Sequence, residues 1–135
     1  MSNKRLIQKD TKTYLDLLYM TPNEVTAKEI ATLLLDSNGL TIELWDAMNV
    51  LELNLSNQNS IDFEPLAVDF KDPSDASFIK NRNIKTIFAV NLCEEDIKIA
   101  VSYFELIIER FSGFLCTDSA DFAPVYVGSS SNKLL

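Results

Sequence analysis

The sequence contains no histidine and only three glycines among its 135 residues. Without histidine the chain lacks the commonest general acid–base group, which excludes Ser-His-Asp and Cys-His nucleophiles and most zinc sites. Gly39, Gly113 and Gly128 are too scattered for either common kind of glycine-rich phosphate-binding loop. These absences argue against several large enzyme classes, and we expect a protein without catalytic activity, cofactor or metal.

Cysteine is scarce, and long apolar runs are missing. Cys93 and Cys116 are the only cysteines, too few for a disulfide framework, and residues 1–12 lack the apolar segment of an export signal. We therefore expect reduced thiols in a cytoplasmic protein, with Cys93 buried for structural reasons. No run approaches the roughly 20 apolar residues that a membrane span needs, so no membrane association is expected.

Negative charge, in contrast, is plentiful and concentrated in one stretch. The net charge is −8, of which residues 43–79 supply −7, with eight acids and Lys71 as the single base. Because self-repulsion of this kind destabilises a compact domain, the stretch predicts a surface for a positively charged partner. An isoelectric point near 4.4 disfavours binding to nucleic-acid phosphates. The acids that we assign to this surface are Glu43, Asp46, Glu52, Asp62, Glu64, Asp69 and Asp75.

Two helices are predicted in the first 40 residues. Residues 4–19 carry apolar side chains near one side of a helix. The second helix is predicted to begin at Thr21, which precedes a proline and would form a capping box with Glu24, and to end before Gly39. Residues 40–48 fit either a strand or a short helix.

A β-hairpin is the clearest prediction for the acidic stretch. Residues 49–55 and 61–64 alternate between apolar and polar side chains and are separated by a five-residue polar loop. Pairing through that loop sets Asn54 opposite Asp62 and Glu52 opposite Glu64, and it places the acids on the face away from the core. Pro65 makes the second strand an edge strand or ends it.

The remaining elements complete an α+β fold with a small, mainly antiparallel sheet, packed against a long helix and the two N-terminal helices. Asp72, the eighth acid, is predicted to cap a short helix. We expect one domain over residues 1–128 and a loose tail over 129–135. The further elements are a helix from Pro73 to about Arg82, a central strand at 84–92, a helix at 94–111, and strands at 114–117 and 125–127.

The long helix carries a second apolar stripe, formed by Ile99, Tyr103 and Leu106. A helix with one face on a sheet rarely needs two stripes. We expect the N-terminal helices to cover this one and the protein to be a monomer, although the stripe also fits a dimer contact.

Three weaker patterns are open to a functional interpretation. Asp69-Phe70-Lys71 has the acid-x-Lys spacing of a class of metal-dependent nucleases, in which a strand presents both groups and another acid, such as Asp62 or Asp46, completes the site. Asp118 and Asp121 fit either a hard-cation site or turn chemistry. Residues 25–34 look like the first helix of a helix-turn-helix, but the next segment has no Lys or Arg to meet DNA.

A family resemblance comes from the distal half of the chain. After the strand and the long helix, residues 113–124 read G-F-x-x-x-D-x-x-D-F-x-P, and together these segments resemble small bacterial immunity proteins, such as those of contact-dependent growth-inhibition systems. The resemblance covers about residues 50–127 and assigns no binding residues. It implies an acidic, cytoplasmic, non-catalytic antitoxin that covers the active site of a cognate toxin, often a basic nuclease.

Overall fold

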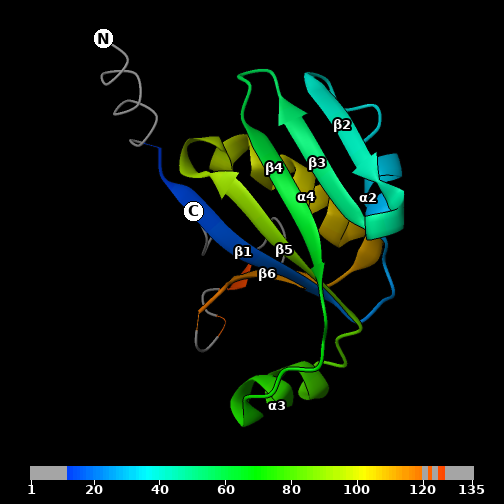
Figure 1. The fold of residues 1–135 in the computed structure, drawn as a ribbon, viewed down its shortest axis with the longest axis vertical. Helices are drawn as coiled ribbons and strands as arrows, with labels where there is room; N and C mark the ends of the chain where they lie inside the picture. The colour runs from blue at the N-terminus through cyan, green and yellow to red at the C-terminus, as the bar shows by residue number, and fades with distance from the viewer. Residues whose placement is uncertain (1–11, 120–121, 123–124, 127–135) are drawn as a thin grey trace.

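The fold is one antiparallel sheet with helices on both of its faces (Figure 1). The computed structural model describes residues 12–119, 122 and 125–126. The seven strands lie in the order β2-β3-β4-β5-β1-β6-β7, which confirms the expected α+β class. The strands are β1 Tyr14–Thr21, β2 Leu40–Trp45, β3 Val50–Leu55, β4 Ser60–Leu66, β5 Thr86–Cys93, β6 Phe114–Thr117 and β7 Val125–Tyr126. The helices are α2 Ala27–Leu33, α3 Pro73–Asn81 and α4 Ile97–Phe111, with 3-10 turns η1 Asp46–Met48 and η2 Glu94–Asp96.

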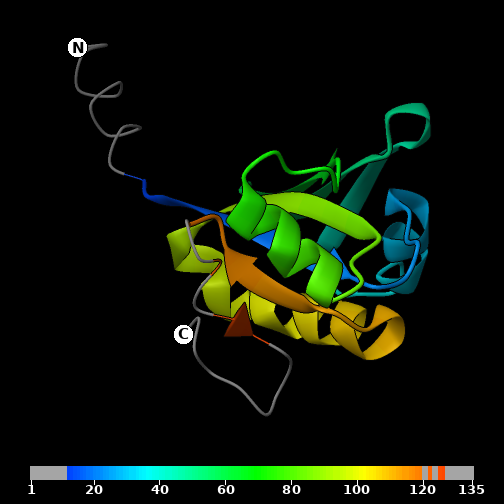
Figure 2. The same ribbon diagram turned by 90° about the horizontal axis from the view of Figure 1, so that it is seen from below.

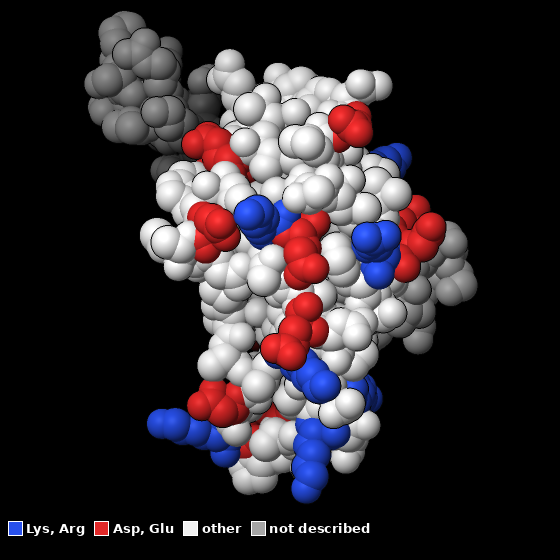
Figure 3. All heavy atoms as spheres, turned by 90° about the vertical axis from the view of Figure 1, so that its right-hand side faces the viewer, with Lys and Arg blue, Asp and Glu red and all other residues white. Residues whose placement is uncertain are grey.

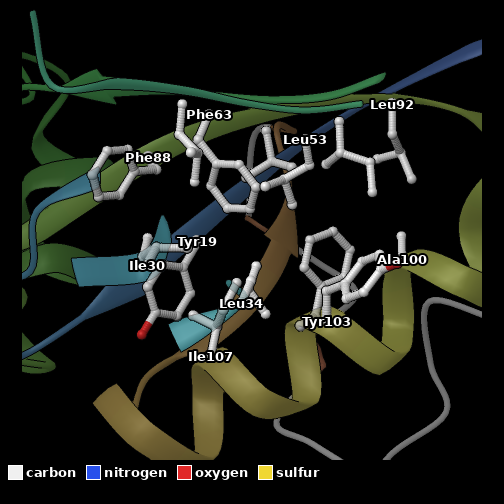
Figure 4. Close-up of a cluster of buried hydrophobic side chains, with 14 of the residues drawn as sticks. Tyr19, Ile30, Leu34, Leu53, Phe63, Phe88, Leu92, Ala100, Tyr103 and Ile107 are labelled. Atoms are coloured by element: carbon white, nitrogen blue, oxygen red, sulfur yellow. The ribbon is translucent and has the colours of Figure 1, made fainter. Parts of the chain in front are cut away.

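The two faces of the sheet are covered unequally. Helices α2 and α4 pack on one face, whereas α3 packs on the other face at one end only (Figures 1 and 2). On the α4 side, strand and helix side chains point toward one another and form the main core (Figure 4). Phe63 lies at its centre and makes edge-to-face contacts with Phe88 and Phe104, at 6.3 and 6.4 Å between ring centroids. No other described element covers the rest of this face, which we call the open face.

The central strand β5 is apolar on both faces, as predicted. Phe88, Val90 and Leu92 enter the main core, and Ile87 joins the smaller core beneath α3. The predicted cap of α3 is also confirmed, because the Asp72 carboxylate accepts from the backbone N–H of Ser74 at 2.8 Å. The alternation along β5 therefore separates the two cores.

The first predicted helix is wrong over the part that the structure describes. Tyr14–Thr21 forms strand β1, between β5 and β6, and residues 4–11 lie outside the described residues. A run that is apolar at nearly every position suits a strand buried on both faces, and turn residues follow it directly at Pro22 and Asn23. Pairing with β5 on one side and with β6 on the other therefore makes this segment a strand rather than a helix.

The second helix begins five residues later than predicted. Its N-cap is Thr26, which forms the capping box with Glu29, and its last residue is Leu33 rather than a residue just before Gly39. The Thr-x-x-Glu spacing occurs twice in succession, and the first copy is used otherwise: the Thr21 hydroxyl donates to the Phe111 carbonyl at 2.7 Å. A local signal present in two copies cannot by itself select the helix start.

The hairpin of β3 and β4 is confirmed, with a register shifted by two residues. Glu52 pairs with Asp62 and Leu53 with Ile61, because the loop is shorter than five residues. The Leu55 N–H donates to the Asn59 carbonyl at 2.8 Å, and Gln58 adopts a left-handed φ of 73°. A shift of two keeps every side chain on its predicted face but sets Asp62, rather than Glu64, directly opposite Glu52.

Two further expectations concern β2 and Pro65. Residues 40–48 contain both alternatives, since Leu40–Trp45 is a strand and Asp46–Met48 a 3-10 turn. The strand leaves no recognition helix for a helix-turn-helix. The prediction that Pro65 ends the second strand or makes it an edge strand is wrong, because β4 runs to Leu66 and lies between β3 and β5. Pro65 is tolerated there because it lies beyond the last β3 pair, at Phe63.

No further helix among the described residues covers the second stripe of α4. Tyr103 is buried in the main core, while Ile99 and Leu106 are about half exposed. The described helices α2 and α4 therefore form a single layer on the sheet.

Candidate functional site: the acidic face of the sheet

A row of polar side chains crosses the open face of the sheet over five neighbouring strands. Glu43 of β2 is paired with Glu52 of β3, and Glu52 with Asp62 of β4. Asp62 is paired with Asn91 of β5, and Asn91 with Asp16 of β1. We call these five residues the acidic row.

The row follows from the alternation of each strand. Its members share a face because the residues on either side of them enter the main core, as Leu51 and Leu53 do around Glu52. With adjacent strands about 4.8 Å apart, the four steps from Glu43 to Asp16 span roughly 19 Å. This length matches a protein contact better than a small molecule.

The ends of the row have hydrogen-bond donors, whereas its centre does not. Asn91 Nδ2 donates to Asp16 Oδ1 at 2.8 Å, and Asn54 Nδ2 donates to Glu43 Oε1 at 3.2 Å. Asp62 Oδ1 is buried and has no hydrogen-bond partner among the described residues. Because like charges on directly opposed strand positions also repel, the Glu52–Asp62 pair destabilises the isolated sheet.

Two hollows flank Asp62. The first measures about 270 Å³ and is lined by Trp45, Met48, Val50, Leu51, Glu52, Asp62 and Glu64. The second measures about 320 Å³ and is lined by Asp16, Leu17, Asp62, Glu64, Ala89, Val90, Asn91 and Asp118. Among the described residues no lysine or arginine lines either hollow, and the charged groups of the described lining are all carboxylates.

The structure brings together four of the seven acids assigned to the binding surface. Glu43, Glu52, Asp62 and Glu64 share the open face. The others lie apart from the row: Asp46 is in η1 after β2, Asp69 in the loop after β4, and Asp75 in the first turn of α3. They belong to the acidic stretch of the sequence but not to the row.

Sequence reasoning missed Asp16 and Asn91. Asp16 was expected on a helix, and only the pairing of β1 with β5 aligns it with Asp62. The available signal was the position of Asp16 as the one charged residue of an otherwise apolar strand-like run. Asp118, which lines the second hollow, was expected only as a cation ligand or turn residue, and its suggested companion Asp121 lies outside the described residues.

The end of the molecule that carries α3 has a different charge. Figure 3 views the molecule from its β2 and α2 side, where acidic and basic side chains are interspersed, and basic side chains gather at the α3 end. The four bases of this region are Lys71, Lys80, Arg82 and Lys85. These bases offset the acids Asp69, Asp72 and Asp75 of the same end, whereas the charged residues described around the two hollows of the open sheet face are all carboxylates.

The nuclease pattern lacks the placement that it requires. Asp69 and Lys71 lie in the loop between β4 and α3 and not on a strand. Among the described residues, the group with metal-ligand spacing is Cys93, Glu95 and Asp96. Asp96 is already committed, because its two oxygens accept from the amides of Asn57 and Asn59, both at 2.8 Å. These contacts tie the β3–β4 loop to the start of α4.

Both thiols are free and buried. Burial, reinforced by the negative charge of Asp118, raises the pKa of Cys116 to about 12. A thiol with this pKa stays protonated near neutral pH, so Cys116 is unsuited to act as a nucleophile.

Comparison with protein-family models, with curated proteins and with solved structures gave no match. None of the helices in the described part of the chain has the length and apolar character needed to cross a bilayer.

Proposed function

We propose that this chain is an immunity protein that binds a basic toxin domain through the acidic row and has no catalytic activity of its own. The observation that supports it most strongly is the unneutralised centre of the row. Among the described residues Asp62 Oδ1 has no hydrogen-bond partner, and the Asp62 carboxylate lies opposite that of Glu52. A cationic side chain from another protein would donate to the Asp62 carboxylate, which lines both hollows, and would remove the repulsion.

The shape of the face suits a protein partner. The row spans roughly 19 Å on a face that α3 covers at one end only, and its two hollows can receive protruding side chains. Charge complementarity over such an area raises the association rate and fixes the orientation of the complex. These are the properties that an inhibitor of a toxin requires.

The partner to test is a basic C-terminal domain of a large secreted protein, sought first in the reading frame immediately upstream. The purified full-length chain and that domain should form a 1:1 complex in size-exclusion chromatography, and calorimetry should give its affinity. The chain with Glu52, Asp62 and Glu64 all changed to lysine should bind at least about 100-fold more weakly, because opposed charges then meet like charges.

A matched control carries the same change in net charge on the helix side of the molecule. Glu24, Asp36 and Glu109 are all exposed, and their change to lysine should reduce affinity by less than about tenfold through long-range attraction alone. Circular dichroism and thermal unfolding establish that both triple variants fold. Equal losses in the two variants, or no complex with the unmodified chain, would refute the proposal.

A further inference from the structure

The first hollow has a wall of different chemistry from the rest of the acidic row. Trp45 and Met48, 42% and 64% exposed, stand beside the carboxylates of Glu52, Asp62 and Glu64. The hollow therefore combines an exposed aromatic and apolar wall with carboxylates, the two kinds of group that an amphipathic cationic side chain contacts.

The wall is held by an anchored turn. Asn49 adopts a left-handed φ of 57° directly after η1, and its side-chain oxygen accepts from the Ala27 N–H at 2.7 Å. This bond ties the turn that carries Met48 to the start of α2, the helix with the capping box. The hollow is therefore formed before any partner arrives.

We propose that this hollow is a pocket for one arginine side chain of the partner. Trp45 lines the hollow with an aromatic side chain on which a guanidinium can stack, Met48 and Val50 offer contacts for the aliphatic stem, and the carboxylates of Asp62, Glu52 and Glu64 in its lining offer acceptors. Arginine is favoured over lysine because its planar group can stack on the ring and donate to two carboxylates at once. A metal ion gains nothing from an indole wall.

This inference rests on the proposed function, since it names the partner group that the acidic row accepts. Its test needs no toxin, however, because Trp45 is the only tryptophan in the chain and its fluorescence reports occupation directly. The probes are acetyl-Gly-Arg-Gly-amide, its lysine counterpart, and its citrulline counterpart, which has nearly the same shape as the arginine peptide but no charge.

Titration with the arginine peptide should give a saturable change in Trp45 emission with a Kd on the order of 1 mM. The citrulline peptide should bind at least about tenfold more weakly, because it lacks the charge that Asp62 accepts, and the lysine peptide severalfold more weakly. The Asp62→Asn variant should lose about tenfold in arginine affinity, while Asp69→Asn, which removes an equal charge outside the hollow, should keep it. Equal binding of arginine and citrulline, equal effects of the two variants, or no saturable change would overturn the inference.

The toxin complex separates this inference from the proposed function. Trp45→Leu should weaken the complex by at least about tenfold, since a buried aromatic–arginine contact is typical of an interface hot spot. If the triple lysine variant abolishes binding and Trp45→Leu leaves it unchanged, the arginine pocket is wrong and the proposed function stands. If the arginine peptide binds and the toxin domain does not, the proposed function fails alone.

Discussion

We expect Asp62 to lower the free energy of unfolding of the protein without its partner, and replacement of Asp62 by asparagine to raise it. The side chain lies directly opposite Glu52, and one of its oxygens is buried without a partner. Asparagine has nearly the same shape, carries no charge, and can turn its amide so that the nitrogen donates to Glu52. The Asp62→Asn variant therefore removes the repulsion and satisfies a buried position.

The magnitude follows from two contributions. Relief of a like-charge cross-strand pair is worth about 0.2–1 kcal/mol, and an unsatisfied buried polar group costs about 1–3 kcal/mol, of which a neutral amide relieves a part. We expect a net stabilisation of about 1–2 kcal/mol. For a domain of this size, that corresponds to a rise in Tm of roughly 4–8 °C.

The assay is urea unfolding and thermal unfolding of the full chain, with Asp69→Asn as the control. Asp69 is exposed in the loop before α3, so its replacement makes the same change in net charge without relieving an opposed pair. The difference in Tm between Asp62→Asn and the unmodified chain should also be smaller in 1 M NaCl, because salt screens the charge repulsion that the substitution removes. A Tm of Asp62→Asn at or below that of Asp69→Asn would refute the reasoning.

Two further predictions concern the packing around α4 and its C-terminal end. Gly113→Ala should lower stability by about 3 kcal/mol or more in urea unfolding, because φ is +93° and the new Cβ would meet the Met20 carbonyl oxygen at 2.1 Å. Gly39→Ala, at φ +74° in open space, should cost only about 1–2 kcal/mol, and equal losses would contradict the close-packing argument. Burial raises the pKa of Tyr19 from 10.0 to about 12. The stabilisation of the folded protein that follows from this shift is fully present below pH 10 and is lost as the pH rises from 10 through 12. The free energy of unfolding, measured across that range, should fall by about 2–3 kcal/mol through this group, and the Tyr19→Phe variant should not show this fall. The same pH dependence of the free energy of unfolding in both proteins would contradict the prediction.

The stability cost at Asp62 is consistent with a surface kept for binding. The alternation along β3 and β4 gives no folding reason for opposed carboxylates at the centre of the open face. Proteins commonly retain such locally unfavourable groups where function requires them. The Asp62→Asn variant links the two ideas, since the substitution that stabilises the free chain should weaken its arginine pocket.

Several features could be predicted from the sequence because they depend on neighbouring residues. The Asp72 cap, the hairpin around residue 58, the central strand with two apolar faces and the long helix ending at Phe111 were all predicted correctly in kind. Alternation also placed Glu52 and Asp62 on the outer face before any pairing was known. A two-residue error in register does not change that face.

Other features were decided only by the tertiary structure, because they depend on segments far apart in the chain. Tyr14–Thr21 is a strand since β5 and β6 pair with it on both sides. Thr26 rather than Thr21 caps α2, since Thr21 bonds to the end of α4.

The candidate site likewise depends partly on the local sequence and partly on the tertiary structure. The sequence by itself determined an excess of acids over residues 43–79 and the outward direction of Glu52, Asp62 and Glu64, because side-chain alternation is a local property of a strand. The tertiary structure alone decided which acids meet: it aligned Glu43, Glu52 and Asp62, added Asp16 from a distant strand, and left Asp69 and Asp75 elsewhere. Strand order and register fix these distances, and both are set by packing between remote segments.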